Sequence, residues 1–223
     1  MSSGIRYIKN LVRQGEHDHL EFKRKAAHPE KIVREVVAFA NSAGGKLLVG
    51  VDDNGDTPGV KFPEEEEYIL NKAIAELCSP KIDYQLEIVK VSEYDEHAIL
   101  VYDIPEGKRK PYYAREKKND KFGKAYIRLA DKSIQASREV VGVLKSKKRN
   151  EETGFEYGEQ EKILMKYLEA NNRITVTEYQ ELAKLPYHLA SKKLILLTAN
   201  NVLRIDPREK VDYFYFSEVS PFS

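Results

Sequence analysis

The stretch AFANSAGGKLLVGVDD, residues 38–53, joins the end of an apolar helical stripe to two glycines and a short apolar run. Glycine commonly ends a helix because its backbone readily adopts the left-handed turn that follows. The run KLLVGV is too short for a helix and too apolar for an edge strand. This stretch therefore predicts a helix, a glycine turn and a buried strand, with a further turn at the two aspartates.

The two glycines of this stretch do not form a phosphate-binding loop. A P-loop has the pattern G-x-x-x-x-G-K-[ST], in which the final hydroxyl contacts magnesium. Here Lys46 is followed by Leu47, the first glycine is missing, and the segment runs from helix to strand. We therefore expect no ATP site, and we expect Lys46 to begin a strand.

The segments around this stretch alternate between helical and extended patterns. Apolar spacing predicts helices over residues 5–13, from Pro29 to the glycines, and after Pro63. Strands are predicted at HLEFKRK, YQLEIVKV, HAILVYDI and AYIRLA. In the first of them, Leu20 and Phe22 share one face, so that Glu21 and Lys23 share the other.

The C-terminal third of the chain has a different pattern. Three helical segments precede two strands, which is the order of a winged helix-turn-helix. We expect an α+β protein: a mixed-sheet domain over residues 1–146, a linker over 147–158, and a smaller winged-helix domain over 159–223.

Composition excludes some functional classes. The chain has 223 residues, 37 basic and 36 acidic, so overall charge gives no argument for nucleic acid. No apolar run is long enough to span a bilayer, and the N-terminus lacks a secretory pattern, so we expect a cytoplasmic protein without a membrane partner. The single cysteine, Cys78, offers neither an internal disulfide nor a metal cluster.

Local patches of positive charge remain candidates for binding nucleic acid. The segment GKRKPYYAREKKNDK, residues 107–121, mixes cations with tyrosines that could stack on bases, although such segments are also ordinary solvated loops. A winged helix would add contacts from its third helix and its wing. The candidate contacts are Lys108, Arg109, Lys110, Tyr112, Tyr113, Arg115, Lys117, Lys118, Arg128, His188, Ser191, Lys192, Arg208 and Lys210.

A second candidate site consists of carboxylates. Acid-x-Lys on a strand is a pattern of metal-dependent nucleases, in which the acid holds a divalent cation and the lysine approaches the phosphate or the attacking water. Glu21 and Lys23 have this spacing, and Glu16 and Asp53 are expected nearby. Oxygen donors of this kind suit Mg²⁺ or Mn²⁺. A simple ion pair explains the triplet equally well.

Three segments together carry a family resemblance: GEHDHLEFK, VREVVAFANSAGGKLLVGVDDNGDTPGV and KPYYAREKKNDKFGKAYIRLADKSIQAS. They resemble the Schlafen AlbA-like domain, also called a divergent AAA domain, over about residues 10–145. The most specific part is the AFAN-type turn with its glycines, followed by GVDD. Tyr126 and Arg128, then Ala136 and Ser137, agree with the second block of the family.

The resemblance implies two different activities. Bacterial members are described as DNA-binding domains of transcriptional regulators and are commonly followed by a winged helix. Schlafen relatives include RNA-cleaving enzymes, and their acidic residues correspond to Glu16, Glu21 and Asp53, with Lys23 following. Those enzymes use a duplicated domain, which a homodimer of this chain would replace.

The sequence therefore leaves three functions to be compared. The first is a transcriptional regulator that binds nucleic acid, with DNA favoured over RNA. The second is a metal-dependent nuclease that uses Glu16, Glu21, Lys23 and Asp53. The third is an oligomerisation module that does not bind nucleic acid.

Overall fold

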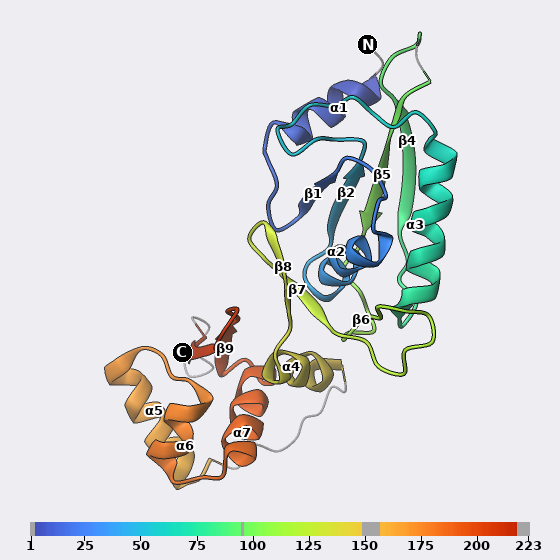
Figure 1. Ribbon diagram of the computed structural model, residues 1–223. Helices are drawn as coiled ribbons and strands as arrows, with labels where there is room; N and C mark the ends of the chain where they lie inside the picture. The colour runs from blue at the N-terminus through green and yellow to red at the C-terminus, as the bar shows by residue number, and fades with distance from the viewer. Residues whose placement is uncertain (1–2, 95, 149–156, 218–223) are drawn as a thin grey trace. The chain divides into compact units, whose positions relative to one another are not determined.

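The computed structural model describes residues 3–94, 96–148 and 157–217 (Figure 1). The chain divides into two compact units, Met1–Gln135 and Ala136–Ser223. The division lies before the expected domain boundary at residue 146, and most of the expected linker lies outside the described residues. Among the described helices, none is long and apolar enough to cross a membrane.

The first unit is built on a mixed four-stranded sheet, which confirms the α+β class. The strand order is β1-β2-β5-β4, with β1 parallel to β2 and the other pairs antiparallel. Its elements are α1 (Ser3–Val12), β1 (Leu20–Lys23), α2 (Pro29–Asn41), β2 (Gly45–Val49), α3 (Pro63–Leu77), β4 (Gln85–Lys90) and β5 (Ala98–Ile104).

Two small antiparallel pairs complete this unit. One joins β3 (Cys78–Ser79) to β6 (Tyr113–Ala114), and the other is the hairpin of β7 (Tyr126–Leu129) and β8 (Lys132–Gln135). The sequence pattern predicted β7 but not the other three strands. Strands of two residues have no periodicity, and β8 places a single buried residue, Ile134, among polar neighbours.

Helices pack on both faces of the sheet, because the apolar side chains of its central strands point alternately to one face and to the other. Leu47 and Leu100 belong to the cluster that includes α2 and α3, whereas Leu48 and Ile99 belong to the cluster that includes α1. Successive residues of a strand point to opposite faces. Each central strand is therefore apolar throughout, which is why KLLVGV contains no polar alternation.

The glycine turn of residues 38–53 has the expected structure. Gly44 adopts a φ of 78°, and its N–H donates to the Phe39 carbonyl, ending α2. Gly45 lies against the Phe39 ring, where a Cβ atom would approach within 2.3 Å of a ring carbon. These glycines are therefore needed for a close helix-to-strand connection.

The second unit contains four helices and a two-stranded hairpin in its described part. The elements are α4 (Arg138–Lys148), α5 (Glu159–Asn171), α6 (Val176–Ala183), α7 (Tyr187–Ala199), β9 (Leu203–Asp206) and β10 (Tyr213–Phe216). The hydroxyls of Ser137 and Thr175 accept from the N–H groups of Val140 and Glu178 and cap α4 and α6. The order of α5 to β10 is the predicted one, and its assignment as a winged helix stays a prediction.

Helix α4 packs on α7 through a buried polar contact. Ser191 of α7 donates to Glu139 of α4 over 2.7 Å, and both residues are buried. Gly142 of α4 faces Ile195 so closely that a Cβ atom would lie 2.6 Å from its Cδ1 atom. One face of α7 is therefore covered by α4.

A buried carboxyl in the same unit gives a prediction about pH. Burial raises the pKa of Asp212, while hydrogen bonds from Ser137 and the Arg208 N–H lower it and the charges of Glu139 and Asp206 raise it. A raised pKa favours the protonated carboxyl in the folded state. The contribution of Asp212 to the stability of the folded state is therefore complete below the ordinary pKa of 3.8. It is lost as the pH rises through the pKa that Asp212 has in the folded protein.

Replacing Asp212 by asparagine is expected to reduce the loss of stability of this unit as pH rises from about 4 to 7. The amide oxygen can keep the hydrogen bond from the Arg208 N–H, whereas the bond with Ser137 must reverse, with the NH₂ donating to the hydroxyl oxygen. Exchange of the α7 and β10 amide hydrogens in the full chain measures this stability. If both proteins lost the same stability over this range, Asp212 would not be the cause.

Candidate functional site

Glu21 lies in a buried ionic cluster on the face of β1 opposite Leu20 and Phe22. Its carboxylate accepts a hydrogen bond from Lys23 and another from Arg128, the latter over 2.9 Å. Arg128 also donates to Glu35 of α2 over 2.8 Å, and its side chain is only 1% exposed. Strand β7 thus supplies one guanidinium that links β1 to α2.

The cluster continues through Ser133 of β8, which donates to Glu35. Burial raises the pKa of Glu35, and repulsion from Glu21 adds to this effect, whereas Ser133 and Arg128 lower the pKa. Arg128 also donates to the His17 carbonyl over 2.7 Å. The cluster fastens the β7–β8 hairpin to the main sheet. Arg128 is therefore enclosed, contrary to its expected role as a contact for nucleic acid.

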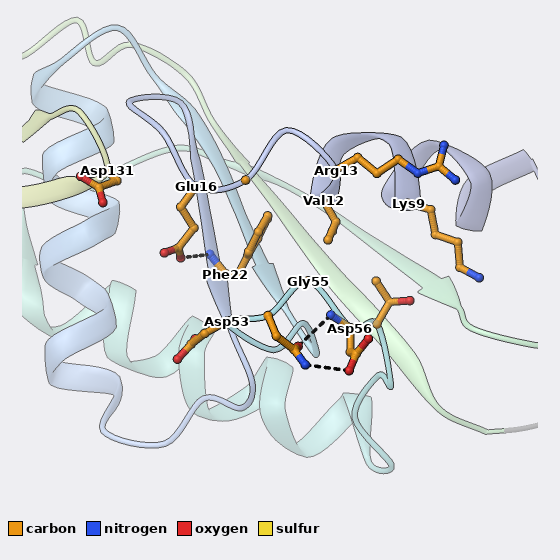
Figure 2. Close-up of a pocket in the computed structure, with 12 residues that line it drawn as sticks. Lys9, Val12, Arg13, Glu16, Phe22, Asp53, Gly55, Asp56 and Asp131 are labelled. Atoms are coloured by element: carbon orange, nitrogen blue, oxygen red, sulfur yellow. Dashed lines mark hydrogen bonds between the residues drawn. The ribbon is translucent and has the colours of Figure 1, made fainter.

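Glu16 and Asp53 lie together at an open pocket of about 710 Å³ (Figure 2). Glu16 accepts a hydrogen bond from the Phe22 N–H over 2.8 Å, and burial raises the pKa of its carboxyl. Asp53 is exposed in the turn after β2. Figure 2 shows these two acids and Asp131 on one side of the pocket, with Lys9 of α1 on the other.

The acidic residues do not fit the expected metal site as they stand. Both oxygens of Glu21 are engaged by cations, and Glu21 is not among the residues that line the pocket of Glu16 and Asp53. Among residues 3–94, 96–148 and 157–217, no group of three or more His, Cys, Asp or Glu residues is arranged to hold a metal. The predicted ligand set for Mg²⁺ or Mn²⁺ is therefore not formed.

Several side chains of the basic segment anchor it to the first unit. Lys110 donates to the Ser42 carbonyl just beyond α2 and to Glu106, and Lys118 pairs with Glu76 of α3. Arg109 donates to the Lys81 carbonyl over 3.0 Å. The contacts with the Ser42 carbonyl and with Glu76 lie at the C-terminal ends of α2 and α3, where positive charge is favourable, so these cations have a structural use.

The tyrosines of this segment are less accessible than the sequence suggested. Tyr112 is 5% exposed, its N–H donates to Asn41, and its hydroxyl accepts from the Arg109 N–H. The ring is therefore unable to stack on a base without unfolding the segment. Tyr113 and Arg115 are half-buried.

Other groups of the segment do face solvent. Lys108, Lys117 and Lys121 are exposed, and none makes an ion pair within the described part of the chain. Lys121 lies over the ring of Phe122, which is 81% exposed. Phe122 is an aromatic candidate that the sequence pattern did not single out, because the paired tyrosines were the more obvious choice. Its position between Lys121 and Lys124 in KFGK was the available signal.

The second unit keeps only some of its predicted contacts exposed. Ser191 is 2% exposed beneath α4, so it is not accessible, whereas Leu189 on the same helix is 39% exposed. The remaining candidates, His188, Lys192, Arg208 and Lys210, are exposed, and Arg208 pairs with Asp206 over 2.6 Å.

Comparison with known proteins gives a match to a family. Residues 16–138 match the family described as Schlafen, AlbA_2, which is more than half of the chain. The chain belongs to the Schlafen AlbA_2 family. The matched residues run from Glu16 through β8, so the four-stranded sheet, the ionic cluster and the basic segment all fall inside the family domain. Membership in this family indicates a function that involves nucleic acid.

One solved structure similar to this chain is the DIP2311 protein from Corynebacterium diphtheriae. The sequences are 16% identical, the TM-score is 0.40, and the match covers 62% of this chain but 25% of the other. The chain therefore spans about a quarter of that relative's length. The search of the curated proteins found no match. Helix α1 precedes the part matched by the AlbA_2 family, and all but the first three residues of the second unit follow it.

Proposed function

We propose that this chain is a DNA-binding regulator of transcription whose first unit holds the phosphate backbone. The single observation that carries the proposal is the match of residues 16–138 to the Schlafen AlbA_2 family. The exposed cations Lys108, Lys117 and Lys121 support it, because they are available for phosphates. RNA remains the alternative polymer.

The basic segment suits such a contact because the residues that anchor it to the protein are different from the lysines that stay free to bind phosphate. Lys110, Lys118 and the buried Tyr112 fix the course of the segment, so the free lysines are held on an ordered loop. An ordered loop loses less conformational entropy on binding than a disordered one. Phe122 offers an exposed ring for an unpaired base.

The second unit has a supporting part in this proposal. His188 and Lys192 on α7 and Lys210 beyond β9 are exposed, whereas the face of α7 that carries Ser191 is covered by α4. A winged-helix contact would therefore use the exposed strip of α7 and the hairpin. We also propose that the chain acts as a homodimer in the cytoplasm.

We do not propose that the chain cleaves nucleic acid. A divalent cation bound by Glu16, Glu21 and Asp53 would have to displace Lys23 or Arg128 from Glu21. Leaving the enclosed Arg128 without that partner would cost free energy.

Changing Lys108, Lys117 and Lys121 together to glutamine is expected to weaken DNA binding by roughly tenfold or more in moderate salt. The slope of log affinity against log salt should become shallower by about 3, one unit for each phosphate that the variant no longer neutralises. Fluorescence anisotropy of a labelled duplex, titrated at several salt concentrations, measures both quantities.

The matched control changes Lys61, Lys72 and Lys90 to glutamine, which removes the same charge from other exposed positions of the first unit. The control should bind DNA nearly as well as the unchanged protein. Equal weakening of binding in the two triple variants would mean that the basic segment makes no specific contact.

A further inference from the structure

Helix α1 presents a cationic face that the sequence patterns did not single out. Arg6, Lys9 and Arg13 lie on α1 or directly after it, and the residues from Ser3 to Val12 include no acid. None of the three cations makes an ion pair or a side-chain hydrogen bond with any other described residue. The basic segment, by contrast, uses several of its cations in contacts within the protein.

The position of these cations follows from the packing of α1. Ile5, Ile8 and Val12 repeat at helical spacing and are buried against the sheet. Polar side chains at the intervening positions must therefore face outward, and Lys9 and Arg13, four residues apart, are neighbours on the helix surface. Tyr7 is 44% exposed on the same helix.

The cations lie close to acids but do not neutralise them. Lys9 and Arg13 line the pocket that also contains Glu16, Asp53 and Asp131. Figure 2 shows Glu16, Asp53 and Asp131 on the side of this pocket away from Lys9 and Arg13, with Asp56 between the two groups. A phosphate would be attracted to the α1 side and repelled from the acidic side. A polyanion would therefore lie along α1, at the mouth of the pocket.

We propose that the face of Arg6, Lys9 and Arg13 is a binding surface for a phosphodiester backbone. This inference rests on the proposed function and adds a second contact region, outside the part of the chain that matches the family. The three charges are exposed or half-buried on a regular helix, so they can approach successive phosphates without rearrangement of the core. The Tyr7 ring on the same helix is also exposed, so it can stack on an unpaired base.

The test changes Arg6, Lys9 and Arg13 together to glutamine in the full chain, which removes charge without burying a polar group. Binding of labelled single-stranded and duplex DNA is followed by anisotropy across a salt series. The α1 variant should lose at least tenfold in affinity, and its salt slope should become shallower by about 2 to 3. Tyr7→Ala should weaken binding of the single strand more than binding of the duplex.

The Lys61, Lys72 and Lys90 variant again serves as the control for removal of three charges. An α1 variant that matches this control in affinity and slope overturns the α1 surface while leaving the proposed function intact. Absence of binding by the unchanged protein at low salt overturns the proposed function and the α1 surface together. A decrease in affinity in the α1 variant beyond that of the control supports the surface for whichever polymer shows it.

Discussion

Replacement of Arg128 by methionine is expected to lower the free energy of unfolding of the first unit by about 3 to 5 kcal/mol. The guanidinium neutralises Glu21 and Glu35 where little water reaches, and it also donates to the His17 carbonyl. Methionine fills part of the same volume but leaves the carboxylates without this partner. A buried charge left unpaired costs far more than an exposed ion pair contributes.

Hydrogen exchange of the β2 and β5 amides in the full chain measures this free energy, because these strands lie at the centre of the sheet. The matched control is Lys132→Met on the same hairpin, where the side chain is exposed. The control should change stability by about 0.5 kcal/mol or less. A similarly small change in Arg128→Met would show that the cluster does not fasten the hairpin.

Gly44→Ala is expected to destabilise the first unit by roughly 2 to 5 kcal/mol, from left-handed strain and from overpacking. Gly44 has a φ of 78°, and a Cβ atom there would lie 2.8 Å from the Ile104 carbonyl oxygen and 2.9 Å from the Glu106 nitrogen. Both contacts are with backbone, which cannot rotate away as a side chain can. The connection from α2 to β2 would therefore have to shift.

Gly15→Ala separates the two causes of this destabilisation. Gly15 has a similar φ of 73°, but no heavy atom lies within 4 Å of the position of its Cβ atom. Only the strain remains, so the decrease in stability should be about 1 to 2 kcal/mol. The same exchange measurement compares the variants, and equal decreases at Gly15 and Gly44 would contradict the packing argument.

Much of the first unit could be predicted because its signals are local. The stripe of Ile32, Val33 and Val36 and the glycines that end it set α2, and the apolar run after Lys46 sets β2. The small strands could not be predicted in this way. The pair of β3 and β6 depends on contact between segments far apart in the chain, and β8 is held by its hairpin and by the bond from Ser133 to Glu35.

The contacts of the candidate site were even harder to predict from the sequence than the small strands. Spacing predicted that Glu21 and Lys23 share a face, and the structure agrees. Spacing could not reveal that Arg128, more than one hundred residues away, neutralises the same carboxylate. Nor could it separate the lysines that anchor the basic segment from those that are free, because that depends on whether a carbonyl such as that of Ser42 lies within reach. Exposure of α1 cations likewise depends on how the helix packs.

Incubation of the unchanged protein with labelled duplex DNA, single-stranded DNA and tRNA, with Mn²⁺ or with EDTA, tests the central claim most directly. We predict salt-dependent retention, strongest for DNA, under both conditions and with the polymers intact. Cleavage that requires Mn²⁺ and disappears in Asp53→Asn would show that the chain is a nuclease and would contradict its assignment as a regulator. Absence of both retention and cleavage at low salt would contradict the claim that this chain acts on nucleic acid.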